Sequence, residues 1–242
     1  MVPLFQLFEF SYPNGLLFYD RSGAVSRRLQ EILPGLALKN SSLDQRDFVM
    51  PGEDLELLFG IALSRIQTLA PGKQEFPSTA ASFLQILTEV LEVTQLKEFH
   101  FRYVLGKLCG SDEEAHKLMW PLVPEEAKAK MSKVAEAPQW QAVQGEFLLG
   151  NLACLSRIAI LYLIPHEKLS PADAKSGRQV PHITFHLDVR GLVPIDAAGF
   201  DAEAFMKNVR ENHSRDILSK LAPHLYGSTN RPHHCDQEPK AL

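Results

Sequence analysis

The stretch that decides the fold of this chain runs from Val180 to Leu221 and reads VPHITFHLDVRGLVPIDAAGFDAEAFMKNVRENHSRDILSKL. From Ile183 to Arg190, apolar residues occupy the odd positions and polar residues the even ones. A period of two is typical of a β-strand with one buried face. After a turn-rich segment, apolar residues and one histidine recur at helical spacing: Phe205, Met206, Val209, His213, Ile217 and Leu221. We expect a strand followed by a helix that packs one apolar stripe on the core.

A second segment, from Leu96 to Leu108, shows the same alternation. Its apolar set is Phe99, Phe101, Tyr103 and Leu105, and its polar set is Glu98, His100 and Arg102. We expect the two alternating strands to belong to one sheet that the last helix covers on its apolar face.

The first hundred residues contain further candidate elements. The pattern predicts a short hairpin over Leu4–Tyr19, then a helix capped by Ser22. It predicts one strand over Leu55–Leu69, with Gly60 as a bulge or a close backbone approach, and a helix capped by Ser78. Residues 36–47 give only a weak strand signal.

The second half begins with two helices. Ser111 and Glu114 form a capping box, and another helix is expected from Pro124 to about Ala137. Residues 140–149 and 153–164 read as antiparallel strands joined by a turn, and residues 166–179 as a loop. The polar residues 227–242 are expected to form a disordered tail.

Strands and helices are mixed without regular alternation, so the expected class is α+β, mainly an antiparallel sheet with helices packed on one face. Residues 1–108 can be written β-α-β-β-α-β, which suggests a duplicated ferredoxin-like arrangement. Residues 109–226 would add helices, antiparallel strands and the last helix to the same sheet or core.

Composition limits the class of protein. The chain has 242 residues, 45% hydrophobic and 22% charged, with a formal net charge of −4. This favours an ordinary globular protein and disfavours a nucleic-acid partner. The three cysteines, Cys109, Cys154 and Cys235, form no CxxC pair, which favours a reducing compartment. The apolar residues 147–165 contain Arg157 near their middle, so we expect buried strands, no membrane span and a cytoplasmic protein.

The common catalytic signatures GxGxxG after a strand, GxxxxGK[ST], HExxH and GxSxG do not occur. We expect no metal and no cofactor. His213 reads as a core histidine, and the tail cluster at 233–236 lacks the supporting residues of a physiological metal site. Cys109 and Cys154 read as inert core thiols.

A polar sheet face gives the candidate site, for which we single out His100, Arg102, His186, Asp188 and Arg190. Alternate residues on a strand stand about 6.5 to 7 Å apart, so His186 and Asp188 could share a proton or a metal. The two arginines would serve as forked donors to an anionic or polar ligand. The alternative is a solvated or helix-shielded outer sheet face.

Three features resemble an uncharacterised, sporadically distributed prokaryotic family of about this length. They are FHFRYV at 99–104, ITFHLDV at 183–189 and the last helix with one histidine, NVRENHSRDILSKL. Arg102 and Tyr103 match the Arg-Tyr pair of that family, Asp188 its acidic strand residue and His213 its helix histidine, whereas Leu105 replaces its Asn. The resemblance implies a fold class and a prokaryotic origin and supplies no activity.

From the sequence we therefore expect a cytoplasmic, non-enzymatic binding or interaction module that could act as a homodimer or with a protein partner. The alternative is an enzyme or small-ligand-binding protein that uses the polar sheet face.

Overall fold

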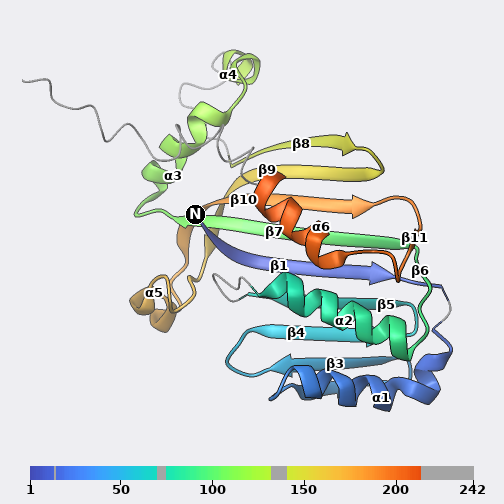
Figure 1. Cartoon of the computed structure of the whole chain (residues 1–242). Coiled ribbons are helices and arrows are strands. Elements are labelled where there is room, and N and C mark those ends of the chain that lie inside the picture. Colours follow the sequence, from blue (N-terminus) through green and yellow to red (C-terminus); the bar gives the residue numbers. More distant parts are fainter. Residues whose placement is uncertain (14, 70–74, 132–140, 214–242) are drawn as a thin grey trace, which may run out of the picture.

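The computed structural model describes residues 1–13, 15–69, 75–131 and 141–213. Nine of its strands form one antiparallel sheet in the spatial order β2-β3-β4-β5-β1-β7-β10-β9-β8 (Figure 1). These strands are β1 (Val2–Ser11), β2 (Ala37–Ser41), β3 (Gln45–Met50), β4 (Leu55–Gly60), β5 (Leu63–Thr68), β7 (Glu98–Leu108), β8 (Ala142–Leu149), β9 (Leu152–Leu163) and β10 (Val180–Gly191). Strands from both halves of the chain share this sheet. A separate ribbon pairs β6 (Gln95–Leu96) with β11 (Ile195–Asp196).

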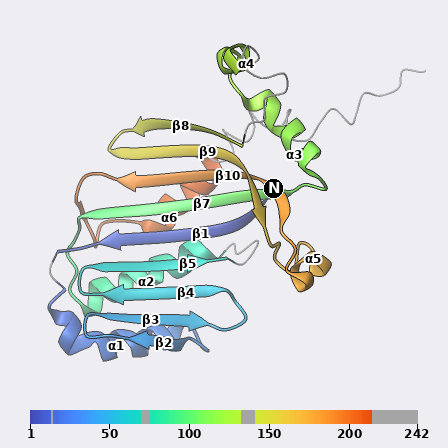
Figure 2. The ribbon, with the colours of Figure 1, turned by 180° about the vertical axis from the view of Figure 1, so that it is seen from behind.

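Three helices cover one face of the sheet: α1 (Leu17–Ile32), α2 (Phe76–Val90) and α6 (Ala202–Asn208). The view from behind shows the strands in front of these helices (Figure 2). The remaining helical elements are α3 (Asp112–Met119), the 3-10 turn η1 (Trp120–Leu122), α4 (Glu125–Met131), α5 (Pro171–Ser176) and the π-helical turn η2 (Val209–His213). The expected α+β class, with an antiparallel sheet and helices, is confirmed.

The core lies between the sheet and α1, α2 and α6. Phe8 on β1 stands opposite Phe101 on β7, which stands opposite Val189 on β10, and all three side chains are buried. Phe205 of α6 contacts the Phe101 ring, with centroids 6.4 Å apart. The strand alternation at 96–108 and 180–191 therefore has the expected cause, because its odd residues pack under the helices.

The start of the chain differs from its expected hairpin. Residues 2–11 form one long strand, whereas Leu17–Tyr19 begin α1. Ser22 is thus a buried residue inside α1 rather than its cap. The four apolar residues 16–19 fit a short strand by composition, but in the fold Phe18 packs beside Phe59, with ring centroids 5.6 Å apart. Tertiary packing decides this segment.

The segment 55–69 is a hairpin rather than one strand. Strand β4 ends at Gly60 and β5 begins at Leu63, so the two are antiparallel neighbours. A Cβ at Gly60 would meet the Asp44 carbonyl oxygen at 2.9 Å, and the carbonyl of Gly60 accepts a hydrogen bond from the Tyr12 hydroxyl. The expected close backbone approach is present. Between α1 and α2 the described residues form four strands, where two are expected from the sequence, and the duplicated ferredoxin-like arrangement is not confirmed.

In the second half of the chain, the observed elements agree more closely with those expected from the sequence. Ser111 caps α3 by accepting a hydrogen bond from the Glu114 amide at 3.2 Å. Strands β8 and β9 pair across the expected turn, in which Gly150 has φ of +60°. The expected loop 166–179 contains the short helix α5, and Ser78 lies inside α2. The predicted helix end at 132–137, the side chain of His213, Ile217, Leu221 and the tail 227–242 lie outside the described residues.

Candidate functional site

The five residues of the predicted site lie on one face of two neighbouring strands. In the register of β7 and β10, His100 stands opposite Arg190, and Arg102 stands opposite Asp188. His186 is the next residue on this face of β10. We call this the open face, defined as the sheet face that carries these five residues and lies opposite α1, α2 and α6.

Asp188 is the centre of the cluster. Its Oδ1 accepts a hydrogen bond from His100 Nε2 at 2.6 Å and another from Arg102 Nε at 2.7 Å. The Asp188 side chain is only 9% exposed. Burial raises its pKa, but the hydrogen bonds with His100 and Arg102 and the Arg102 charge outweigh burial, so the pKa of Asp188 lies below its ordinary value. Asp188 therefore stays ionised and fixes both neighbours.

His186 is held separately from Asp188. The Thr184 hydroxyl donates to the carbonyl of Ala159 at 3.0 Å, so it accepts from His186 Nε2, also at 3.0 Å. Burial and the nearby charge of Arg157 lower the pKa of His186, more than Asp188 raises it. His186 is thus a neutral, oriented imidazole. The expected partnership of His186 with Asp188 is not formed, because His186 bonds to Thr184 and the histidine that bonds to Asp188 is His100.

His182, the remaining even-numbered histidine of β10, is buried. Its Nδ1 donates to the carbonyl of Val180 at 3.0 Å, and burial lowers its pKa. A satisfied, buried histidine of this kind is structural.

Two arginines of this face are exposed and unpaired. Within the described part of the chain, neither Arg190 on β10 nor Arg157 on β9 has a hydrogen-bond or ion-pair partner. Arg157 stands opposite His186 in the β9–β10 register, and Arg190 stands opposite Ala153. Both guanidinium groups are therefore available to a ligand.

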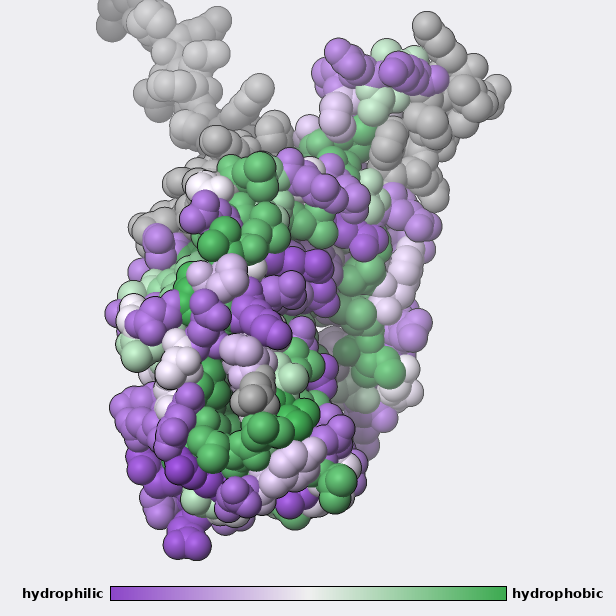
Figure 3. Space-filling view, turned by 90° about the vertical axis from the view of Figure 1, so that its right-hand side faces the viewer, coloured by the Kyte–Doolittle hydropathy of each residue, from purple (hydrophilic) through white to green (hydrophobic). Residues whose placement is uncertain are grey.

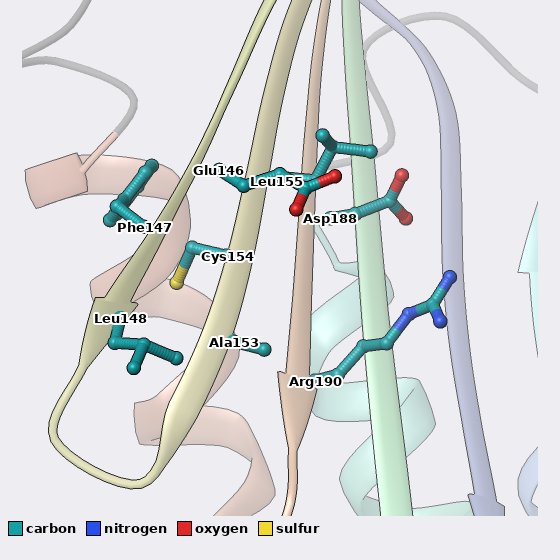
Figure 4. A pocket seen from close by; sticks show the side chains of 8 residues that line it. All are labelled: Glu146, Phe147, Leu148, Ala153, Cys154, Leu155, Asp188 and Arg190. Atoms are coloured by element: carbon teal, nitrogen blue, oxygen red, sulfur yellow. The ribbon is translucent and has the colours of Figure 1, made fainter.

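Two hollows adjoin Arg190. One, of about 390 Å³, lies over β8, β9 and β10, and Figure 4 shows Asp188 and Arg190 extending to the same side of β10 there. Glu146, Leu148 and Leu155 also line it. The other, of about 350 Å³, extends over β1 and β7 and is lined by His100 and Arg190, among others. Arg190 thus stands between an apolar-walled hollow and a more polar one.

Carboxylates flank the arginines. Glu9 and Glu98 line the second hollow and Glu146 the first. None of the three has an ion-pair partner among the described residues. The open face therefore offers cationic groups at β9 and β10 with anionic groups on either side.

Sequence reasoning identified the charged residues of β7 and β10 but missed Arg157 as part of the site. Arg157 was visible as a charge inside an apolar strand, and its position opposite His186 depends on the β9–β10 register. The alternation of Leu155 and Arg157 with Ser156 and Ile158 does not indicate which side faces the helices, because both sets mix polar and apolar residues.

No group of three potential His, Cys, Asp or Glu metal ligands occurs within residues 1–213 as far as the structure describes them. The cluster at 233–236 lies outside the described residues. In the described segments, no helix has both the length and the apolar character to cross a membrane.

The chain matches no protein-family model, and no curated protein matches it. The resemblance to a sporadically distributed prokaryotic family therefore stays an expectation.

Proposed function

We propose that this protein is a non-enzymatic binding module whose open face takes an anionic ligand or an acidic segment of a partner protein. One observation carries the proposal. Asp188 is occupied by His100 and Arg102, whereas the neighbouring Arg190 and Arg157 are exposed and unpaired. The buried carboxylate orders the face, and the free guanidinium groups are left for a ligand.

The arrangement favours a ligand with an acidic group next to an apolar part. A guanidinium group binds carboxylate or phosphate oxygens in a bidentate manner. Beside Arg190, the first hollow has the apolar side chains of Leu148, Ala153 and Leu155. A carboxylate at Arg190 would place an attached apolar group against them.

Two further expectations belong to this proposal. A cytoplasmic location is supported by the two described cysteines, Cys109 and Cys154, which are buried free thiols. A prokaryotic origin rests on the sequence resemblance alone.

A thermal-shift assay tests the anion site. The probes are inorganic phosphate, succinate, a branched aliphatic carboxylate and an Asp-rich peptide, each with wild type, Arg190→Ala and Arg27→Ala. Arg27 is a matched control, because it is an exposed, unpaired arginine of α1. A probe at a hundred times its dissociation constant should add about 2.7 kcal/mol to the unfolding free energy of wild type and of Arg27→Ala. Arg190→Ala should lose most of that gain. Equal responses from all three proteins, or no response to any probe, contradict the proposal.

An enzyme is the second candidate, and the His100–Asp188 hydrogen bond of 2.6 Å favours it. A carboxylate that orients an imidazole is the arrangement of a general base, and His100 also borders the second hollow. NMR of each stabilising probe during long incubation with the protein separates the two functions. An unchanged probe supports a binding module, whereas conversion that His100→Gln abolishes supports the enzyme.

A further inference from the structure

The two edges of the sheet differ in how well they are protected against further strand pairing. At one edge, β2 has only five residues, and its register with β3 shifts between Leu38 and Asn40. Lys39 of β2 also forms an ion pair with Glu56 at 3.0 Å. Short length, an irregular register and a lysine are the features by which edge strands avoid pairing with other chains.

The opposite edge, β8, lacks these features. It has eight residues, pairs with β9 without a register shift, and contains no lysine and no proline. No strand of the described chain pairs with its outer side. Phe147 and Leu148 are 41% and 73% exposed, and apolar side chains are visible at the end of the molecule to which β8 and β10 point (Figure 3). An exposed, regular edge strand with apolar residues is a template for a further strand.

Hydrogen bonding shows which groups of β8 face outward. The carbonyl of Gln141 accepts from the amide of Ile160 at 2.8 Å, and these residues continue the β8–β9 register. In an antiparallel pair, hydrogen-bonded residues alternate with non-hydrogen-bonded ones. The odd-numbered residues of β8 thus bond to β9, and the amides and carbonyls of Ala142, Gln144, Glu146 and Leu148 point to the free edge.

We propose that β8 pairs antiparallel with β8 of a second copy of this chain, about a two-fold axis at Gly145. This register uses the outward-pointing groups, because it pairs Gln144 with Glu146 of the second copy and Ala142 with its Leu148. Each such pair exchanges two backbone hydrogen bonds. The nine-stranded sheets of the two copies become one continuous sheet.

Charge and shape select this register over its neighbours. A shift that centres the axis on Glu146 places two carboxylates directly opposite each other, which is unfavourable. The register at Gly145 instead places an amide opposite each carboxylate and Phe147 opposite Val143. A shift that centres the axis on Gln144 places Phe147 opposite the polar Gln141.

Gly145, on the proposed axis, has room for a larger side chain. The proposed strand pair also borders the candidate site. A Cβ at Gly145 would have only the Ser156 Oγ near it, at 3.9 Å. Glu146 and Leu148 line the first hollow beside Arg190, so each copy's hollow would lie next to the shared strand pair. The pairing does not depend on whether the open face binds an anion.

Sedimentation equilibrium over a range of concentrations tests the pairing with two substitutions at one exposed position. Wild type should form a reversible dimer. Gln144→Glu places a carboxylate opposite Glu146 twice and should weaken the dimer by roughly tenfold, whereas Gln144→Lys should strengthen it. Thermal melts at low concentration, where the chain is monomeric, check that both variants fold equally well.

Cross-linking tests the axis directly. Opposed residues of a non-hydrogen-bonded pair stand about 4.5 Å apart at Cα, within reach of a disulfide. Gly145→Cys should therefore give an oxidised dimer on a non-reducing gel, whereas the exposed Gln141→Cys should not. A wild-type chain that stays monomeric at all concentrations overturns the proposal. A dimer that ignores both charges at position 144, or that Gly145→Cys fails to link, also overturns it.

Discussion

The two faces of the β7–β10 strand pair are built from the same eleven or twelve residues per strand and have opposite chemistry. On the helix side, Phe101 and Leu187 are fully buried among other apolar side chains. On the open face, Arg102 and Asp188 form an ion pair with an exposed Arg190 beside it. Burial of each large apolar side chain contributes about 1.5 to 3 kcal/mol, whereas exposed charges contribute little. The stability of the fold thus depends mainly on the side chains of the helix side. Those of the open face are less constrained by folding and are available to bind a ligand.

Phe101→Ala should show the largest effect. The Phe101 side chain is 0% exposed and stacks on Tyr103, with ring centroids 6.3 Å apart. Its truncation leaves a cavity and should lower the free energy of unfolding by about 3 to 5 kcal/mol in urea denaturation. A loss below about 1 kcal/mol would mean that the helix side does not dominate stability.

Asp188→Asn should have an intermediate effect, because this residue is the buried part of the open face. The substitution keeps the shape but removes the charge that binds Arg102 and His100. We expect a loss of about 1 to 3 kcal/mol at neutral pH. Glu98→Gln, an exposed and unpaired carboxylate of the same face, is the control and should change stability by less than about 0.5 kcal/mol. Equal losses in the two variants would show that the Asp188 cluster has no structural role.

The pH dependence of stability should be smaller and should come from the same face. The folded-state pKa of His186 lies below the unfolded value of about 6.5, chiefly because of burial. The unfolded chain therefore binds more protons at mildly acidic pH, and stability falls as the pH drops below about 6.5 toward the folded-state pKa. Arg157, Asp188 and Arg102 are the charged groups that act on this imidazole. Urea denaturation at several pH values measures the free energy of unfolding. As the pH falls, this free energy should decrease less for His186→Gln than for wild type. An equal decrease in both proteins would contradict the role given to His186.

Arg190→Ala should have the smallest effect on stability. The side chain is exposed and has no partner among the described residues, so the unfolding free energy should change by less than about 0.5 kcal/mol. The chemical denaturation curve of Arg190→Ala should coincide with that of wild type, although this variant loses the stabilisation by ligand. That result would show that the open face serves binding and the helix side serves stability. A large loss of stability would instead show that Arg190 is structural.

Much of the fold could be predicted in segments where the apolar residues repeat at the spacing of the secondary structure and are also the residues that the fold buries. The alternation in 96–108 and 180–191 predicted both strands and placed His100, Arg102, His186, Asp188 and Arg190 on polar faces. The polar faces of the two strands lie on the same side of the sheet because β7 and β10 pair as antiparallel neighbours in this register. The contacts of Asp188 depend on a register that no local pattern encodes.

The errors also have a physical basis. Apolar residues at 55, 57, 59, 61 and 63 keep one period through the β4–β5 turn, so the turn is hidden. Beyond it the buried residues are Ser64, Ile66 and Thr68, and two of these are polar. Tyr12 explains one of them, because its hydroxyl lies 3.0 Å from Ser64 Oγ. A buried polar contact between distant segments cannot be seen in the periodicity of either.

The place of β1 in the strand order has a consequence for biosynthesis. Although Val2–Ser11 is synthesised before the other strands of this sheet, it lies between β5 and β7, so its second neighbour exists only after Leu108 has been made. Until then this phenylalanine-rich segment can pair with a neighbouring strand along only one of its two edges. Contacts so remote in sequence slow folding and leave apolar surface exposed to other nascent chains. We expect the yield of this protein in cells to depend on chaperones that bind the emerging segment during translation.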